Sequence, residues 1–579
     1  MKSRPSALIC EICGWTAFSS IIRHMPEPSV LSAKTPATPA GVFAFPRAGR
    51  WGLVALAIAL LTVIPVAVIF SAWVKPEADI LGHLTQFVLP ELLTNTFWLL
   101  LGVGIGVTVL GVSLAWLTAM CEFPGRKFFS WALLLPLAVP AYVLAFVMIG
   151  LLDFTGPLQT WLREQFGPLQ LPQIRSRGGV IFVMALALYP YVYLIARNAF
   201  LTQGRAALEA AQSLGLNRWH GFRRVALPMA RPWIAAGLML ALMETLADFG
   251  TVSIFNYDTF TTAIYKAWFS LFSLSAASQL SSILILFVLI LALAEQRTRS
   301  HMKYGGVGRA TSHNRIRLSR GQALGATFYA GLVFAVAFLI PLIQLLLWAK
   351  GATATDLDSR YWEFVRNSLW LSGLGAAIVC ALALLLGYAG RQKPGQFMQL
   401  TQRVATIGYA FPGTVLAVGI FIPVAWLDNL IIDLLKAQGW QGTEVLKGTL
   451  LVMLLAYAVR FLAVGFGPTD SGLHRITRNI DEAARVMGTG TLSLLSRVHL
   501  PMLRASLFTA AALAFVDIMK EMPITLMTRP FGWDTLAVRV FEMTSEGEWE
   551  RAALPSVAII LAGLVPIIFL AGRGDNANA

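Results

Sequence analysis

Four carboxylates lie inside long apolar segments of the chain, where ionisable residues are rare. They are Glu244, Asp248, Asp517 and Glu521. The first two fall within residues 232–255 and the last two within residues 503–527, and the members of each pair are four residues apart. If these segments are helices, each pair shares one helix face. A charge at the centre of a bilayer costs at least about 2.5–3.5 kcal/mol, so such residues usually face a polar interior.

Two interpretations of these carboxylates are open from the residues alone. In the first, they line a path through the membrane and attract a cation. In the second, they are structural, because they sit near the outer helix ends or pair with Lys520 and Arg460.

The composition indicates what surrounds these charges. Of the 579 residues, 57% are hydrophobic and only 13% are charged, whereas a soluble domain carries roughly 25% charged residues. A helix crosses the hydrocarbon layer with about 20 residues, and we count twelve apolar runs of this kind. The predicted spans are residues 51–74, 94–117, 129–151, 178–198, 232–255, 279–295, 323–349, 367–389, 404–427, 447–466, 503–527 and 552–572. The sequence therefore predicts an all-α polytopic membrane protein.

The distribution of Lys and Arg predicts the orientation. Segment 296–322 contains seven basic residues and no acidic residue, so the positive-inside rule places it in the cytoplasm. Twelve spans then put both termini in the cytoplasm. Segments 350–365 and 529–551 are acidic and fall outside, and loop 152–177, with three arginines, is a mild exception.

The two halves of the chain repeat at an offset of about 272–273 residues. Matching stretches recur in one order: 95–98 with 367–370, 139–145 with 411–417, and 209–211 with 482–484. The same offset pairs Glu244 with Asp517 and Asp248 with Glu521. Each half has an even number of predicted spans, so this is a parallel repeat about an axis along the membrane normal.

Two prolines, Pro140 and Pro412, are also matched by the repeat. We expect them to kink or break the third and ninth spans beside the path. The alternative is a kink that only suits packing against lipid.

Two loops, residues 209–228 and 482–501, carry one pattern. In each, Glu-Ala-Ala is followed by a glycine six residues after the glutamate and a proline nineteen residues after it. The residues are Glu209, Ala210, Ala211, Gly215 and Pro228, and Glu482, Ala483, Ala484, Gly488 and Pro501. Glu-Ala-Ala starts a helix well and its alanines leave a bare surface. Glycine permits a sharp turn, and proline tolerates a helix start but disfavours helix just before itself. We expect two short helices joined by a turn, as a cytoplasmic docking element; the alternative is an amphipathic loop without a partner.

Other classes of function are disfavoured. The net charge of +15 comes from basic residues between apolar spans, which is not the basic face of a nucleic-acid-binding domain. Cys10 and Cys13 form one C-x-x-C pair without a second, so no zinc site or other fixed metal site is predicted. No H-E-x-x-H motif or nucleophile elbow occurs, and no Walker A motif is present. We therefore expect a chain that is no enzyme and binds no cofactor.

The repeated loops resemble the EAA loops of binding-protein-dependent ABC importer permeases of the type I class. In that family, the loop docks into a groove of the cytoplasmic ATPase. The fused two-half form, with DFGT at 248–251 and EMPITLMTRPFGWDTLAVRV at 521–540, is similar to the ferric-iron permeases. The resemblance covers residues 90–572, and permeases for putrescine, thiamine and phosphonate are close relatives. One departure is Glu521-Met522-Pro523, where Glu-Leu-Pro is commoner.

This resemblance implies a domain organisation. The expected parts are a disordered cytoplasmic tail (1–50), a first transmembrane helix and outer loop (51–90), a first ABC transmembrane type-1 domain (91–295), a basic cytoplasmic linker (296–322), a seventh transmembrane helix and outer loop (323–365), a second type-1 domain (366–572) and a short tail (573–579).

The resemblance also implies the function. The chain is expected to be the multi-pass permease subunit of an importer in a bacterial inner membrane, passing ferric iron from a periplasmic or lipid-anchored binding protein. Two copies of a separate ATPase, which use the ATP, dock on the two loops. The alternatives are a polyamine, thiamine or phosphonate importer of the same family and an ion-coupled secondary transporter. The last does not predict the repeated loop spacing.

Overall fold

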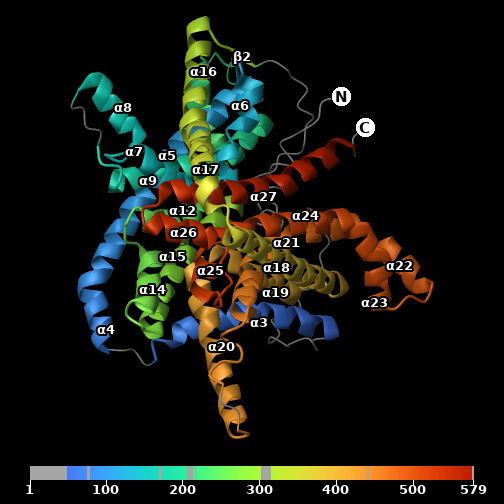
Figure 1. The fold of residues 1–579 in the computed structure, drawn as a ribbon. Coiled ribbons are helices and arrows are strands. Elements are labelled where there is room, and N and C mark those ends of the chain that lie inside the picture. Colours follow the sequence, from blue (N-terminus) through green and yellow to red (C-terminus); the bar gives the residue numbers. More distant parts are fainter. Residues whose placement is uncertain are drawn as a thin grey trace.

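The computed structural model describes residues 49–74, 78–167, 172–204, 211, 213–215, 217–300, 315–439 and 442–576. The predicted tail up to residue 48, residues Glu209 and Ala210, and linker residues 301–314 lie outside this set. The described chain is almost entirely helical (Figure 1).

The elements follow one another in two similar series. The first contains α3 (Arg50–Ser71), α4 (Ala78–His83), η1 (Leu84–Val88), α5 (Leu89–Met120), β1 (Cys121–Glu122), α6 (Arg126–Ala132), η2 (Leu135–Ala138), α7 (Ala141–Leu152), α8 (Pro157–Phe166), α9 (Arg177–Ala199), η3 (Phe200–Gly204), α11 (Arg218–Gly221), η4 (Phe222–Ala226), α12 (Leu227–Ala247), α13 (Gly250–Ile254), α14 (Phe260–Phe269) and α15 (Leu274–Ser300). The second contains β2 (Ile316–Arg317), α16 (Arg320–Phe334), η5 (Ala335–Leu339), α17 (Ile340–Asp356), α18 (Ser359–Gln392), α19 (Gln396–Thr406), η6 (Ile407–Ala410), α20 (Gly413–Lys436), α21 (Leu451–Arg475), α22 (Arg478–Val486), α23 (Thr491–Leu494), η7 (Leu495–His499), α24 (Leu500–Met519), α25 (Pro523–Thr528), α26 (Leu536–Ser545) and α27 (Trp549–Asn576).

Eleven helical segments of the described chain are long and apolar enough to cross a membrane. They fall at the first eleven predicted spans, and α27 occupies the position of the twelfth. The most apolar windows of α9 and α21 are 83% and 78% buried, more than in the other segments, so these two helices lie deepest in the bundle. The predicted all-α polytopic fold is confirmed.

The third and ninth predicted spans are not single helices. Each begins with a short helix and a 3-10 turn, then breaks at proline before a new helix starts. Pro140 has ψ of 140° and Pro412 has ψ of 147°, and both cap the helix that follows, α7 or α20. Proline cannot donate a backbone hydrogen bond and keeps the preceding residue extended, so the helix stops at this point.

The repeat predicted from the sequence extends to individual hydrogen bonds. The turns η2 and η6 match at an offset of 272 residues, and α14 and α26 are both 10 residues long. The Asn95 side-chain amide donates to the Asp258 carbonyl at 3.1 Å. The matching Asn367 donates to the Asp534 carbonyl at 3.2 Å. In both halves, this bond ties the N-terminal part of α5 or α18 to the segment before α14 or α26.

The first helix of each series packs on the opposite half. Helix α3 lies against α18, α19 and α20 (Figure 1), and the Thr62 hydroxyl donates to the Ala405 carbonyl at 3.1 Å. Helices α16 and α17 lie against α6 and α7, where the Trp348 ring stacks on Phe146. The halves are therefore interlocked rather than merely adjacent.

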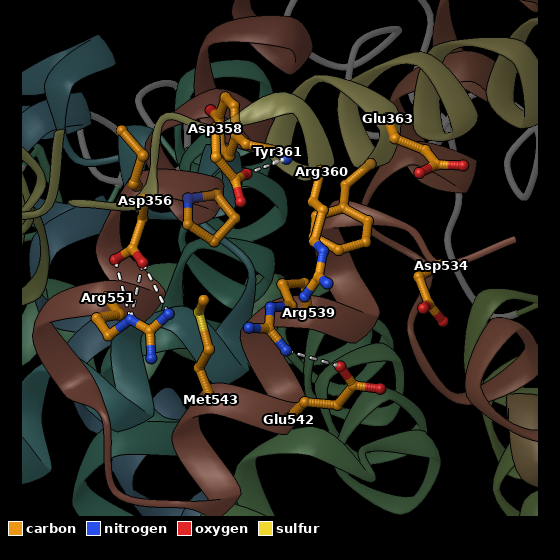
Figure 2. A pocket seen from close by; sticks show the side chains of 13 residues that line it. Asp356, Asp358, Arg360, Tyr361, Glu363, Asp534, Arg539, Glu542, Met543 and Arg551 are labelled. Atoms are coloured by element: carbon orange, nitrogen blue, oxygen red, sulfur yellow. Dashed lines mark hydrogen bonds and ion pairs between the residues drawn. The ribbon is translucent and has the colours of Figure 1, made fainter. Parts of the chain in front are cut away.

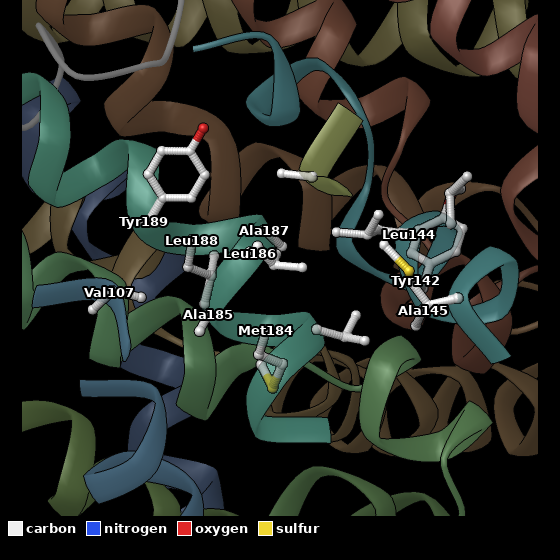
Figure 3. Packing of buried hydrophobic residues seen from close by; sticks show 14 of the residues in the cluster. Val107, Tyr142, Leu144, Ala145, Met184, Ala185, Leu186, Ala187, Leu188 and Tyr189 are labelled. Atoms are coloured by element: carbon white, nitrogen blue, oxygen red, sulfur yellow. The ribbon is translucent and has the colours of Figure 1, made fainter. Parts of the chain in front are cut away.

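One hydrophobic core joins α5, α7 and α9 to helices α16, α17, α26 and α27 of the second series (Figure 3). Val107 of α5, Leu144 of α7 and Leu186 of α9 are all buried there. Close approach of α5 and α9 depends on small residues, since a Cβ on Gly106 would come within 2.7 Å of the Ala185 Cβ. Small residues at helix contacts are the usual means of tight packing in membranes.

Candidate translocation cavity and docking loops

A cavity of about 170 Å³ lies between the two halves. Its lining residues include Pro140, Glu244, Asp248, Asp517 and Glu521. The structure thus brings together all four membrane carboxylates and one of the two prolines. Pro412 is not among the described residues that line it.

The prediction that each carboxylate pair shares one helix face is wrong. Helix α12 ends at Ala247, and Asp248 has ψ of 131° outside it. The Asp248 carboxylate accepts hydrogen bonds from the Thr251 hydroxyl at 2.9 Å and from the Val252 amide at 3.2 Å. These groups belong to α13, so Asp248 caps a new helix.

Glu521 acts in the same way in the second half. It follows the end of α24, and its carboxylate accepts a hydrogen bond from the Ile524 amide at 3.1 Å, in the first turn of α25. Free backbone N–H groups at a helix start favour a carboxylate there. Apolar composition continues through both breaks, which is why the sequence predicted unbroken spans.

Two cations also reach the cavity. Arg460 of α21 lies 3.4 Å from the Glu521 carboxylate and donates to the Phe411 carbonyl at 3.1 Å. Lys520 lies 2.8 Å from Asp517. Lys520 and Arg460 are therefore the ion-pair partners of Asp517 and Glu521, as the structural interpretation of these carboxylates expects.

Glu244 differs from the other three carboxylates. It is partly buried at the cavity wall, and it makes no hydrogen bond or ion pair with any residue that the structure describes. Its charged neighbours are Asp248, Arg460, Lys520, Asp517 and Glu521. Glu244 is thus the carboxylate best placed to meet a group that enters the cavity.

Tyr142 is a cavity residue that the sequence did not single out. Its side chain is 7% exposed, and its hydroxyl has no hydrogen-bond partner among the described residues. The repeat matches it with Thr414, whose hydroxyl is also buried and unpartnered in the described chain. The only signal in the sequence was its place two residues after the matched proline.

No group of three or more His, Cys, Asp and Glu side chains in the described chain is arranged to hold a metal ion. The cavity therefore presents separate charges rather than a closed coordination shell.

A second cavity, of about 390 Å³, opens where α17, α18, α26 and α27 meet (Figure 2). Two ion pairs form between its lining residues: Arg551 binds Asp356 at 2.7 Å, and Arg539 binds Glu542 at 3.3 Å. Asp358 caps α18 by accepting from the Tyr361 amide. These residues fall in the two acidic segments, 350–365 and 529–551, so the structure gathers both at one face.

The second docking loop has the predicted form of a helix, a turn and a helix. Helix α22 carries Glu482 and Ala483 on its exposed side, whereas Ala484 is 2% exposed. The expectation of a bare two-alanine surface is therefore wrong, because Ala484 packs inward. Gly488 has φ of 81°, which places the turn in the left-handed region that favours glycine.

The described part of the first loop agrees with the second. Ala211 is 3% exposed, and Gly215 has φ of 84°. Glu209 and Ala210 lie outside the described residues.

The matched prolines of the loops do not interrupt the helix before them, contrary to expectation. Pro228 and Pro501 stand in the first turn of α12 and α24, directly after the π-helical turns η4 and η7. A π-turn changes the hydrogen-bond spacing locally, so the backbone passes the proline without a break. The second short helix therefore continues into the membrane helix in each half.

Large apolar side chains are exposed at the tips of both loops. Val486, Met487 and Leu492 are 88%, 76% and 69% exposed, and Leu214 is 84% exposed. Figure 1 shows α22 and α23 projecting beyond the ends of α18 and α24. Val486 ends α22 and Leu492 is in α23, whereas Met487 and Leu214 are in the turns beside the matched glycines.

The chain matches one protein family in both halves and is similar to several named proteins. The family described as "Binding-protein-dependent transport system inner membrane component" matches residues 108–300 and 373–573, one match in each half. The chain is 27% identical to the Fe(3+)-transport system permease protein FbpB 2 of Haemophilus influenzae, over 83% of this chain and 89% of that protein.

Further relatives are named for ferric iron and for sulfate. The ferric transport system permease protein FbpB of Actinobacillus pleuropneumoniae is 22% identical over 85% of this chain and 72% of that protein. The sulfate transport system permease protein CysW of Escherichia coli is 31% identical over 36% of this chain and 71% of its own length.

Since the family matches both halves and covers most of the chain, this multi-pass membrane protein is a permease of the binding-protein-dependent ABC importer family, in a form with two fused halves.

Proposed function

We propose that this permease imports ferric iron, received from a periplasmic or lipid-anchored binding protein, across a bacterial inner membrane. It is driven by two copies of a separate ATPase, one on each docking loop. The ATPase uses the ATP, and this chain binds no cofactor. Both termini lie in the cytoplasm, on the same side as the loops.

The observation that carries the docking proposal is the exposure of apolar side chains on both loop tips. Leu214 in the first loop and Met487 in the second stand one residue before the matched glycines, and both are largely exposed. Apolar groups exposed in this way mark protein interaction sites. Because the two tips match, one partner type binds both, as two copies of one ATPase would.

The charge of the cavity between the halves supports a cationic cargo. Four carboxylates and two cations line it, and the two cations are each paired with a carboxylate. Asp248 is occupied as a helix cap, which leaves Glu244 to attract a positive charge. Carboxylate and phenol oxygens, here from Glu244 and Tyr142, are the donors that hard metal cations prefer.

The second candidate is an oxyanion importer. It is favoured by the sulfate permease relative and by relatives named for molybdenum and 2-aminoethylphosphonate transport. Arg460 and Lys520 would then be the groups that meet the cargo.

Uptake into proteoliposomes separates the candidates. With the purified binding protein and ATPase, we expect vanadate-sensitive uptake of ferric iron, and at least a tenfold loss in Glu244→Gln at unchanged protein yield. Sulfate or phosphonate uptake without iron uptake would replace the ferric proposal. Full iron uptake by a Glu244→Gln and Glu521→Gln double variant at normal yield would reject the path role of these carboxylates.

A further inference from the structure

A buried ionic cluster joins the second docking loop to the membrane helices. The Asp481 carboxylate, in the first turn of α22, accepts from Arg391 Nε at 2.7 Å and from Arg391 Nη2 at 3.0 Å. Its Oδ1 atom also lies 2.8 Å from His499 Nε2. The side chains of Asp481, Arg391 and His499 are 8%, 10% and 0% exposed. We call these three residues the loop cluster.

The loop cluster connects α22 to three membrane helices at once. Arg391 is in the last turn of α18, and it also donates to the carbonyls of Leu473 at 2.6 Å and Ile476 at 2.9 Å, at the end of α21. His499 ends η7, which continues directly into α24. A displacement of α22 therefore acts on α18, α21 and α24 through one carboxylate.

Tyr388 extends the loop cluster to the second helix of the loop. Its hydroxyl donates to the Thr491 carbonyl at 2.7 Å, at the start of α23. Its ring meets the His499 ring edge-on, with 5.4 Å between centroids. Both helices of the docking loop are thus held to the end of α18.

At the positions that the repeat aligns with the loop cluster, the sequence of the first half has no charged residue. The repeat offset places Ala119 opposite Arg391, Leu208 opposite Asp481 and Ala226 opposite His499. In the described part of the first half, Trp116, which aligns with Tyr388, lies 5.4 Å from Phe200 and 4.4 Å from Phe222, between centroids. Apolar rings can slide on each other, whereas a forked arginine–carboxylate pair fixes both distance and angle.

We propose that Asp481, held by Arg391 and His499, is a positioning residue that makes the second docking loop move as one body with α18, α21 and α24. This inference rests on the proposed function, because it requires that the ATPase docks on the loops.

The test uses the complete complex of permease and ATPase in proteoliposomes, with the binding protein added. Asp481→Asn keeps the shape and removes the charge. We expect it to retain the ATPase on co-purification and to hydrolyse ATP within twofold of the unaltered complex. We also expect uptake to fall at least tenfold, so that more ATP is hydrolysed for each ion transported.

Two further variants sharpen the test. Arg391→Lys keeps one charged donor but loses the fork, and we expect a smaller uptake loss of about threefold with the same change in coupling. The matched control is Arg366→Gln, on the same helix as Arg391, whose exposed pair with Glu363 lies outside the loop cluster and the docking loop; its coupling should be unchanged. If Asp481→Asn does not accumulate, Arg391→Lys supplies the result.

The outcomes separate the two proposals. Normal uptake per ATP in both Asp481→Asn and Arg391→Lys would overturn the positioning role and leave the docking proposal intact. Loss of the ATPase from Asp481→Asn would also overturn it, because Asp481 would then serve docking itself. Failure of the unaltered permease to bind any ATPase would instead contradict the proposed function.

Discussion

In the first half of the molecule, Asn95 donates to a carbonyl before α14, and in the second half Asn367 does the same before α26. Helix caps, proline breaks and left-handed glycines are likewise present in both halves. The charged contacts are not: Lys520 aligns with Ala247, and Arg391 aligns with Ala119. The two halves therefore keep the groups that shape the backbone, whereas the cations Lys520 and Arg391 have no charged counterpart at the aligned positions of the first half.

The difference predicts that the second half is the more sensitive to loss of a charge. Replacing Arg460 by Met leaves the Glu521 carboxylate buried without its cation, and we expect a loss of about 3–5 kcal/mol in unfolding free energy. Asp248→Asn in the first half keeps an oxygen that can cap α13, and should cost about 1 kcal/mol or less. Thermal unfolding in detergent measures both. Equal losses would remove the distinction between the halves.

The matched glycines should be indispensable in both halves. Gly215→Val and Gly488→Val each put a β-branched residue at positive φ, with a strain of about 1–3 kcal/mol. We expect each single change to lower uptake at least tenfold by displacing the loop tip. Gly490→Ala is the matched control, since Gly490 has φ of −71° and open space at its Cβ position. Normal uptake in either valine variant would show that its loop is not needed.

Replacing either of the matched asparagines by alanine should lower the stability by a similar amount. Asn95→Ala removes one side-chain hydrogen bond to a backbone carbonyl and Asn367→Ala removes two, and a loss of about 1–3 kcal/mol is expected where the carbonyl stays buried. Unfolding of the two variants should shift to a similar extent. A loss confined to one half would mean that the repeat is not equivalent even in its backbone contacts.

The smallest expected effect is a dependence of stability on pH that arises from Asp481 in the second docking loop. Burial opposes ionisation of Asp481, but hydrogen bonds from Arg391 and His499 outweigh it and lower the pKa of this carboxyl. The stabilisation is therefore present above the usual Asp pKa of about 3.9 and is lost as the pH falls through the lower folded-state value.

Thermal unfolding between neutral and strongly acidic pH tests this dependence. We expect the unfolding temperature to fall below about pH 4, and Asp481→Asn to weaken that fall. The groups facing Asp481 are Arg391, His499 and Tyr388. Because Arg485 is not one of them, adding Arg485→Gln to Asp481→Asn should leave the acid response of the unfolding temperature unchanged. An unchanged acid response in Asp481→Asn would contradict the assignment.

Much of the fold could be predicted because it depends on local composition. Apolar runs of sufficient length located the spans, and the repeat offset paired the two series correctly. The helix breaks at Asp248 and Glu521 were missed, since hydrophobicity is continuous there and the break depends on a carboxylate that finds free amides in the next helix. The breaks at Pro140 and Pro412 were predicted, because proline itself removes the donor.

The residues of the candidate site could be predicted only in part, because some of its contacts join residues that are far apart in the sequence. The offset brought the four carboxylates to one place, and the cavity contains all of them. The loop cluster joins Arg391 to Asp481 across 90 residues of sequence, and no spacing rule links such distant charges. The same holds for the contact of α3 with the second half, which only the tertiary fold reveals.

The most direct test of ATPase docking is to purify the permease from its native cells and count the ATPase subunits that remain bound to it. The account predicts two copies of one ATPase per permease chain, together with uptake that needs ATP and stops with vanadate. Uptake that persists without ATP and follows an ion gradient, with no ATPase bound, would contradict it.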